Sequence, residues 1–344
     1  MPTALRTYLF TDLLGYGHVL QVDGDAAAAR LLRVYRRLVT GQIPPAPTAT
    51  IQEVSGDTIF AAFRSPDDAI RASLAIVRAV DGHNQRRPDL PIRIGTGIHA
   101  GQTVRQGRDY VGSAVAVAMR LSHAADPGQI LITDTVYALV RTAGVAPMND
   151  LGAWGPRGFG QVVHVYEVVA SHSGTSATTR AYVQRQLLAV LFTDIVLSTD
   201  REVALGDRRW KGLVERHHAM VRAELERHQG QEVDTAGDGF FATFDAPSRA
   251  IECSLAIRDS VRTLGLDLRV GIHVGECEIV AGKVGGIAVV VGARTREAAN
   301  PGEILVTQTV KDVVAGGTFV FATPRTRSLK GIPGKWRLYG VGDR

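Results

Sequence analysis

Hydrophobic and polar positions follow the same series of patterns twice along the chain. Each series opens on an apolar, β-rich run that ends in Thr-Asp, at Asp12 and again at Asp194. Apolar residues then recur at spacings of three and four over residues 26–38 and 210–228. That spacing places them on one side of a helix, so each series predicts a strand followed by an amphipathic helix.

A hairpin, a second helix and a further strand follow in both series. Two short apolar runs are joined through Gly-Asp, at Asp57 and at Asp238, and predict the hairpin. Helical spacing returns over residues 66–80 and 246–264. The resulting order β-α-β-β-α-β is that of a ferredoxin-like α+β fold. In that order the first strand and the hairpin can lie side by side, which would bring the two aspartates of each series to one edge of the sheet.

The two series are copies of one domain. Several blocks match in the same order, among them Phe-Thr-Asp, Gly-Asp-x-x-Phe-Ala-x-Phe, and Pro-Gly followed by Gln or Glu and Ile-Leu. Arg93-Ile-Gly also matches Arg269-Val-Gly. The separation between matching blocks shortens after Phe63, so we expect a longer connection in the first copy, near residues 81–91. The period is far too long for a solenoid repeat, which indicates duplication of a whole domain.

A small, polar stretch without periodicity lies between the copies and predicts a flexible linker. We therefore predict a first domain over residues 1–169, a linker over residues 170–186 and a second domain over residues 187–344. Apolar residues make up 45% of the chain, which is enough for two cores of about 150 residues each.

Composition narrows the classes of function. No apolar run reaches the ~18 residues of a membrane span, and the N-terminus is too polar for a secretory signal, so we expect a cytoplasmic protein without membrane contact. Cys253 and Cys277 lie in stretches typical of core elements, which favours buried thiols. The net charge of +5 comes from scattered arginines without interleaved aromatic residues, so we expect no nucleic-acid partner.

Taken together and in order, these motifs resemble the catalytic domain of class III adenylyl and guanylyl cyclases. Phe-Thr-Asp on a first strand and the later Gly-Asp hairpin carry the resemblance, and predicted helices ending in Arg120 and Arg294 extend it. The resemblance covers nearly all of both copies. It implies an enzyme that converts a nucleoside triphosphate into a 3′,5′-cyclic nucleotide and pyrophosphate, in intracellular signal transduction.

The resemblance also implies how the two copies work together. Catalytic domains of this family pair head to tail, so the tandem would pair internally and offer two sites between its copies. In each site one domain supplies two aspartates for two divalent cations, Mg²⁺ or Mn²⁺, and the partner domain supplies groups for the base and the phosphates. A further protein partner is left open.

The resemblance implies a role for individual residues of this chain. The metal-binding positions are Asp12, Asp57, Asp194 and Asp238. The base-binding positions are Glu53, Asp109, Asp234 and Lys283. The arginines at the reacting phosphate are Arg120 and Arg294, and the triphosphate-binding positions are Arg157 and Lys330. The site with Asp12 and Asp57 would use Asp234, Lys283, Arg294 and Lys330, and the site with Asp194 and Asp238 would use the other four.

The chain departs from the family pattern at several of these places. Ala116 and Val290 replace the asparagine that the family has four residues before the arginine, and Leu197 replaces a glycine of the phosphate-facing turn. Acidic residues stand where adenylyl cyclases have a base-reading lysine, as in guanylyl cyclases. We therefore expect GTP at the Asp12 and Asp57 site, with ATP as an alternative, and assign no base to the other site.

Other interpretations of the same residues remain open. Aspartates can simply end strands, arginines can favour helix ends through the helix dipole, and the charged base-binding positions can be solvated surface. His99 and His273 follow Gly-Ile on a strand and are more typical of structural residues than of ligands. The alternative to an active cyclase is a catalytically degenerate nucleotide-binding regulatory module of the same fold, or a dimerisation scaffold.

Overall fold

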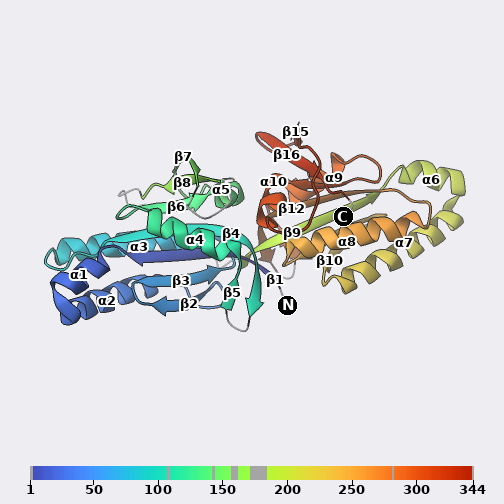
Figure 1. Cartoon of the computed structure of the whole chain (residues 1–344). Coiled ribbons are helices and arrows are strands. Elements are labelled where there is room, and N and C mark those ends of the chain that lie inside the picture. The colour runs from blue at the N-terminus through green and yellow to red at the C-terminus, as the bar shows by residue number, and fades with distance from the viewer. Residues whose placement is uncertain are drawn as a thin grey trace. The chain divides into compact units, whose positions relative to one another are not determined.

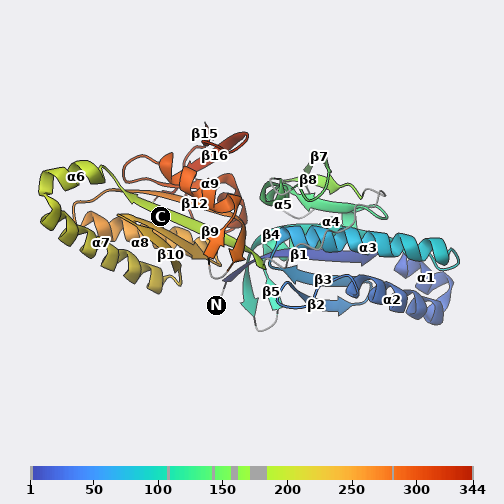
Figure 2. The same cartoon turned by 180° about the vertical axis from the view of Figure 1, so that it is seen from behind.

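The computed structural model describes residues 3–106, 109–141, 144–155, 162–170, 184–280 and 283–342. The chain divides into two compact units, residues 1–181 and residues 182–344. The division falls inside the predicted linker, of which residues 171–183 lie outside the described residues. Figures 1 and 2 show the elements of each unit, which we describe separately.

Each unit contains one mixed sheet, and the two sheets have the same strand order. In the first unit the elements are β1 (Thr3–Leu13), α1 (Tyr16–Val22), α2 (Gly24–Thr40), β2 (Ala49–Ser55), β3 (Thr58–Phe63), α3 (Pro66–Arg86), β4 (Ile94–Gln106), β5 (Asp109–Val111), α4 (Ser113–Ala124), β6 (Ile130–Thr133), α5 (Asp134–Val140), β7 (Met148–Trp154) and β8 (Val163–Val168). Its strands lie in the order β2-β3-β1-β4-β6-β8-β7, and β5 pairs with β4.

The second unit repeats this arrangement. Its elements are β9 (Gln184–Ile195), α6 (Ser198–Leu205), α7 (Asp207–Arg227), β10 (Gln231–Ala236), β11 (Gly239–Phe244), α8 (Pro247–Arg262), β12 (Leu268–Val280), β13 (Lys283–Gly285), α9 (Ile287–Glu297), β14 (Ile304–Thr307), α10 (Gln308–Val313), β15 (Arg325–Ser328) and β16 (Lys335–Gly340). The order is β10-β11-β9-β12-β14-β16-β15, with β13 beside β12. Strand β9 starts before residue 187, where we placed the second domain.

The first four strands of each sheet confirm the predicted ferredoxin-like order. Strand β1 runs antiparallel between β3 and β4, and β9 runs antiparallel between β11 and β12. Three further strands extend each sheet beyond this core: β4 and β12 pair in parallel with β6 and β14, and two antiparallel strands follow. The mixed α+β class is therefore as predicted, and each sheet is wider than the sequence pattern indicates.

The alternation of side chains along β1 and β9 divides each core into two layers. Tyr8 and Phe10 face α4, where they pack with Phe60 and Ala118, and Phe10 stacks on Phe60 at 4.4 Å. The intervening residues face α2 and α3, as the hydrogen bond between Thr11 and a side chain of α2 shows. In the second unit Phe192 likewise stacks on Phe241, at 4.5 Å. The aspartates that end β1 and β9 continue the layer that faces α4 and α9.

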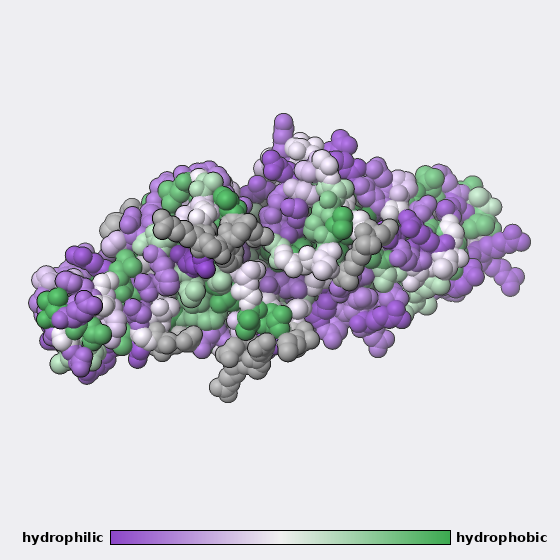
Figure 3. Space-filling view, in the orientation of Figure 1, coloured by the Kyte–Doolittle hydropathy of each residue, from purple (hydrophilic) through white to green (hydrophobic). Residues whose placement is uncertain are grey.

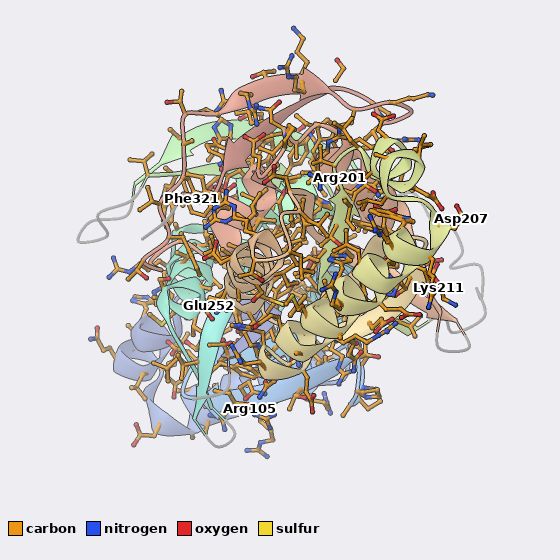
Figure 4. The ribbon with its side chains drawn as sticks, turned by 90° about the vertical axis from the view of Figure 1, so that its right-hand side faces the viewer. Arg105, Arg201, Asp207, Lys211, Glu252 and Phe321 are labelled. Atoms are coloured by element: carbon orange, nitrogen blue, oxygen red, sulfur yellow. The ribbon has the colours of Figure 1, made fainter. Side chains whose placement is uncertain are left out.

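The predicted helices are present, with ends that differ from the pattern. Helix α3 has 21 residues and its counterpart α8 has 16. The longer connection expected near residues 81–91 therefore mainly extends a helix instead of forming a loop. Figures 1 and 2 show α7 and α8 side by side. Helix α7 buries Leu213 and Val221, while Asp207 and Lys211 project from its outward side (Figure 4).

Two smaller predictions are confirmed. Cys253 and Cys277 are free and buried, and burial raises the pKa of each thiol to about 12. His99 and His273 are held structurally, because the Nδ1 atom of each lies within 2.8 Å of a threonine hydroxyl, that of Thr133 or Thr307. None of the helices among the described residues combines the length and the apolar character needed to cross a membrane.

Candidate functional site

Asp12 and Asp57 lie at the same edge of the first sheet. The register of β1 and β3 pairs Asp12 with Thr58, so Asp57 sits in the turn directly beside the end of β1. The backbone N–H of Leu13 donates to the carbonyl of Asp57 at 2.9 Å, which ties the strand end to the turn. Gly56 takes a φ of +52° in this turn, a conformation that glycine adopts readily. The sequence spacing therefore produces the juxtaposition that the strand order allows.

The surroundings of the Asp12 carboxylate contain few cations. The hydroxyl of Thr58 donates to its Oδ1 at 3.2 Å, and Nε2 of His123, from the end of α4, lies 3.8 Å from the same atom. Burial raises the pKa of Asp12 from its usual range, the His123 ring lowers it, and the charge of Asp57 raises it. Among the described residues no arginine forms an ion pair with either carboxylate. The pair therefore presents negative charge at a half-buried edge.

Helix α2 supports this edge from the other face of the sheet. The hydroxyl of Tyr35 donates to the carbonyl of Thr11 at 2.8 Å and lies 2.7 Å from its Oγ1. Burial raises the pKa of Tyr35, so the phenol stays protonated and keeps donating. Arg36 donates to the carbonyl of Gly56 at 3.0 Å. These contacts hold both the strand end and the turn in place.

Asp194 and Asp238 occupy the equivalent edge of the second sheet. Here the backbone N–H of Ile195 donates to the carboxylate of Asp238, Oδ2, at 2.9 Å, instead of to a backbone carbonyl. His217 and His218 of α7 replace the tyrosine and arginine of the first unit, and their Nε2 atoms donate to the carbonyls of Asp238 and Gly237. One oxygen of Asp238 is therefore already used within the protein.

Arginines approach Asp194, in contrast to Asp12. The register of β9 and β12 places Arg269 directly opposite Asp194, and its Nη1 lies 4.0 Å from Oδ2. Burial raises the pKa of Asp194, and the charges of Arg296 and Arg269 lower it, while those of Asp238 and Glu297 raise it. In the first sheet Gly95 stands opposite Asp12, at the place of this arginine. The two edges share a backbone and differ in charge.

Very close packing of a helix end on the sheet creates these contacts. A Cβ atom on Gly97 would lie 2.3 Å from the backbone nitrogen of Ser122, and one on Gly271 would lie 2.1 Å from that of Arg296. Glycine at these strand positions lets the last turns of α4 and α9 touch the strand backbone. The residues of those turns are consequently brought to the aspartate edge.

The two pairs differ in how well they fit a divalent cation. Magnesium and manganese prefer carboxylate oxygens and retain several water or phosphate ligands. Among the described residues no group of three or more histidine, cysteine, aspartate or glutamate side chains gathers, so each edge offers two carboxylates. Asp12 and Asp57 fit such a cation because their charge is not paired with arginine. Asp194 and Asp238 fit it less well, because Nη1 of Arg269 lies 4.0 Å from Asp194 and the Ile195 amide engages one lone pair of Asp238.

The arginines at the predicted phosphate positions lie on equivalent helices. Arg294 of α9 is half-buried, and its Nη1 donates to Glu297 at 2.6 Å from Oε1 and 2.7 Å from Oε2. Arg120 of α4 is also half-buried. Val290, in place of the family's asparagine, is exposed on α9, and Ala116 is half-buried on α4. Neither side chain can donate a hydrogen bond.

The remaining predicted positions are placed only in part. Asp234 on β10 is exposed and its Oδ1 accepts from the backbone N–H of Thr235 at 2.9 Å, and Lys330 is exposed between β15 and β16. Glu53, Asp109 and Lys283 lie on β2, β5 and β13, but their side chains are outside the described residues, and so is Arg157. The base-binding roles therefore remain predictions.

Leu197 shows a further difference between the units. It caps α6 with φ +56° and ψ +37°, a left-handed conformation, where Gly15 caps α1 at φ +81°. Its side chain is 60% exposed. Val203 and Leu205 of α6 are exposed as well, and apolar colour lies over this helix in Figure 3. A bulky residue thus occupies the turn that follows the Asp194 strand.

Several residues near the aspartates were not identified as site residues from the sequence. The sequence assigned no role to Thr58 and His123 at the first edge, or to Arg269, Arg296 and Glu297 at the second, although Thr58 and Arg269 lie within matched blocks. The three-residue spacing of Arg294 and Glu297 on one helix was the available signal for their ion pair. The others needed the strand register and the helix contact.

The second unit can be compared directly with known proteins. Residues 182–342 match the family described as the adenylate and guanylate cyclase catalytic domain. The second unit is therefore similar to this catalytic domain over nearly its whole length, and the first unit shares its strand order.

The chain is also similar to individual proteins. A pH-sensitive adenylate cyclase of Mycobacterium tuberculosis is 30% identical over 158 residues, which cover 44% of this chain and 36% of the relative. The chain thus spans about a third of the length of this curated relative. Among solved structures, an adenylate/guanylate cyclase/hydrolase from Silicibacter pomeroyi is 28% identical with a TM-score of 0.44, covering 49% of this chain and 98% of that one. An adenylyl cyclase from P. aeruginosa is 20% identical with a TM-score of 0.45, covering 48% and 97%.

Proposed function

We propose that the chain is a nucleotide cyclase that works as an internal pair of its two units. The ribose 3′-oxygen of a nucleoside triphosphate attacks the α-phosphorus, the bond from that phosphorus to the bridging oxygen breaks, and pyrophosphate leaves. The hydroxyl proton is lost to solvent or phosphate. The products are a 3′,5′-cyclic nucleotide and pyrophosphate.

The observation that carries the proposal is the placement of Asp12 and Asp57. Two carboxylates at one sheet edge, with no arginine paired to either in the part of the chain that the structure describes, supply the hard oxygen ligands that suit Mg²⁺ or Mn²⁺. When bound, two such cations would lower the pKa of the 3′-hydroxyl and neutralise triphosphate charge. Tyr35 and Arg36 donate to the backbone carbonyls of Thr11 and Gly56, which precede the two aspartates, and so restrain the backbone from which both carboxylates project.

The second unit would supply the phosphate and base contacts. Arg294 would bind the reacting phosphate and stabilise the charge that develops there, and Lys330 would bind the triphosphate. Asp234 would accept from the N1 and N2 protons of guanine, and Lys283 would donate to O6, so we propose GTP as substrate, with ATP as the alternative. The free oxygen of Asp234 supports this, because Thr235 uses only Oδ1.

Exposed apolar residues support internal pairing. Val111 and Met119 are exposed in the first unit, and Ile287 and Val290 are exposed on α9 of the second. Both sets lie on or beside the helices that carry Arg120 and Arg294. Apolar residues gathered near a functional helix are typical of a surface that another protein surface covers.

A regulatory nucleotide-binding module is the second candidate. The pair between Arg294 and Glu297 favours it, because a phosphate would have to compete with Glu297 for the guanidinium. Ala116 and Val290 favour it as well, since one lost transition-state donor costs about 10²–10³ in rate. Such a module would bind triphosphate without converting it.

The test uses the purified full chain with Mn²⁺ or Mg²⁺ and each of ATP, GTP, CTP and UTP. Mass spectrometry would detect a 3′,5′-cyclic product, and the Asp57→Ala variant serves as control. A cyclic product that Asp57→Ala loses supports the cyclase and names its base. No product from any triphosphate, together with metal-dependent triphosphate binding, would replace the cyclase with the regulatory module.

A further inference from the structure

The two aspartate edges have equivalent places in their sheets and differ in the basic side chains that surround them. At the first edge, Asp12 and Asp57 face the hydroxyl of Thr58 and the ring of His123. At the second edge, Arg269 and Arg296 act on Asp194. We infer that the tandem is asymmetric: the Asp12 and Asp57 pair takes divalent cations, and the Asp194 and Asp238 pair is neutralised by the protein's own arginines and takes none. This inference rests on the proposed function only in treating carboxylate pairs as metal ligands.

Arg269 lies directly across the ladder from Asp194, and Arg296 has the larger electrostatic effect on the Asp194 carboxylate. Cross-strand neighbours in an antiparallel pair point to the same face of a sheet, so Arg269 and Asp194 share the face on which a cation would bind. A dication at Asp194 would lie beside a guanidinium that cannot lose its proton. Binding would therefore require the arginine to leave its carboxylate and would still suffer repulsion from it.

A second cation and a backbone amide complete the neutralisation. Arg296 reaches Asp194 electrostatically because Gly271 lets the end of α9 touch the strand. The Ile195 amide donates to Oδ2 of Asp238, so one lone pair of that carboxylate is already engaged within the protein. At the first edge the equivalent amide, on Leu13, donates to a backbone carbonyl instead and leaves the Asp57 carboxylate unengaged by it.

The first edge cannot adopt the same arrangement. A Cβ atom on Gly95 would lie 2.4 Å from the carbonyl oxygen of Ser122 and 2.9 Å from that of Ala125. Any side chain at this position would collide with the backbone at the end of α4. The packing of the first unit thus excludes an arginine at the place where the second unit has one.

The turn that follows each aspartate-bearing strand also differs between the two units. Gly15 leaves the start of α1 without a side chain, whereas Leu197 places an exposed isobutyl group at the start of α6. Backbone N–H groups at such a turn can approach phosphate oxygens closely only when no bulky side chain intervenes. Leu197 therefore adds a bulky, exposed side chain to the turn after Asp194, where the first unit has none.

The test measures Mn²⁺ affinity of the full chain by electron paramagnetic resonance, with Mn²⁺ alone as probe. Asp238→Asn retains the first pair, Asp57→Asn retains the second, and circular dichroism checks that both variants fold. We expect Mn²⁺ to bind Asp238→Asn at least tenfold more tightly than Asp57→Asn. Adding Arg269→Gly to Asp57→Asn, which installs the residue that the first unit has, should tighten binding at least fivefold.

A measurement on the wild-type chain tests the asymmetry without any substitution. Low Mn²⁺ should broaden the backbone amide resonance of Leu13 and leave that of Ile195 sharp. Equal broadening, equal affinities of the two variants, or no Mn²⁺ binding to Asp238→Asn would each overturn the inference. The cyclic-product assay is a separate readout: product formation with equal Mn²⁺ affinities defeats only the asymmetry, and unequal affinities without product defeat only the cyclase.

Discussion

The guanidinium of Arg294 is held by Glu297, one turn further along α9, at 2.6 Å and 2.7 Å from its two carboxylate oxygens. Both side chains are partly exposed, and exposed ion pairs of this kind contribute about 0.2–1 kcal/mol. The pair therefore restrains Arg294 without burying it. The Nε atom of the Arg294 guanidinium lies buried without a hydrogen-bond partner among the described residues. A phosphate group that replaced Glu297 would therefore bind a guanidinium that has an unused donor.

Glu297→Gln should raise kcat/KM for cyclic nucleotide formation about two- to fivefold, because the arginine no longer has to leave a carboxylate before it binds phosphate. Steady-state kinetics with the preferred triphosphate would measure this. Arg294→Ala is the matched control and should lower kcat by about a hundredfold or more. A lower kcat/KM in Glu297→Gln would show that Glu297 positions Arg294 productively.

Leu197→Gly should stabilise the chain by roughly 0.5 kcal/mol. A leucine in the left-handed conformation costs about 1–2 kcal/mol of stability. Replacing it with glycine removes this cost, but glycine is more flexible in the unfolded chain, which offsets about half of the gain. Urea unfolding would measure the change. Gly15→Ala, at the equivalent turn of the first unit, should destabilise by about 1 kcal/mol. A destabilised Leu197→Gly would mean that the leucine side chain makes compensating contacts.

Gly271→Ala should destabilise the second unit by about 1–3 kcal/mol, because its Cβ would force α9 away from β12. Gly212→Ala is the control: it lies inside α7 with nothing within 4 Å of the added atom, so it should stabilise by up to about 1 kcal/mol. Thermal unfolding followed by circular dichroism distinguishes the two. Similar effects of both substitutions would contradict the close packing.

The strand order and the aspartate edges could be predicted from the sequence, because apolar periodicity and turn residues are local signals. The charged side chains around Asp194 and Asp238 could not be predicted in this way. The sequence allows two alignments here: Arg269 matches Arg93 when the blocks of arginine, aliphatic residue and glycine are matched, and Gly95 when Gly-Ile-His is matched. The strand registers place Arg269 at the position of Gly95. A shift of two residues keeps each side chain on the same face, so hydrophobic alternation gives no warning of it.

Lowering the pH from 6.5 to about 4 should destabilise the first unit through His99. Desolvation lowers the pKa of this histidine to about 4, so in that range the unfolded chain binds a proton that the folded chain does not. Stability present above pH 6.5 is lost as the pH falls, by an amount on the order of 1–3 kcal/mol.

Urea unfolding at several pH values, for the wild type and for His99→Gln, would test this. The variant lacks the titrating ring and should lose less stability between pH 6.5 and 4, although it loses the Thr133 contact at every pH. Parallel pH profiles of the two proteins would assign the acid sensitivity to other groups.

The contact between Gly271 and the end of α9 determines which side chains surround Asp194. Because the helix end rests on the strand backbone, whatever residue stands at 296 is delivered to Asp194, and whatever stands at 269 faces it across the ladder. The charge at this edge is therefore governed by two side chains on different elements, and substitutions at 269 and 296 should change it without altering the aspartates themselves.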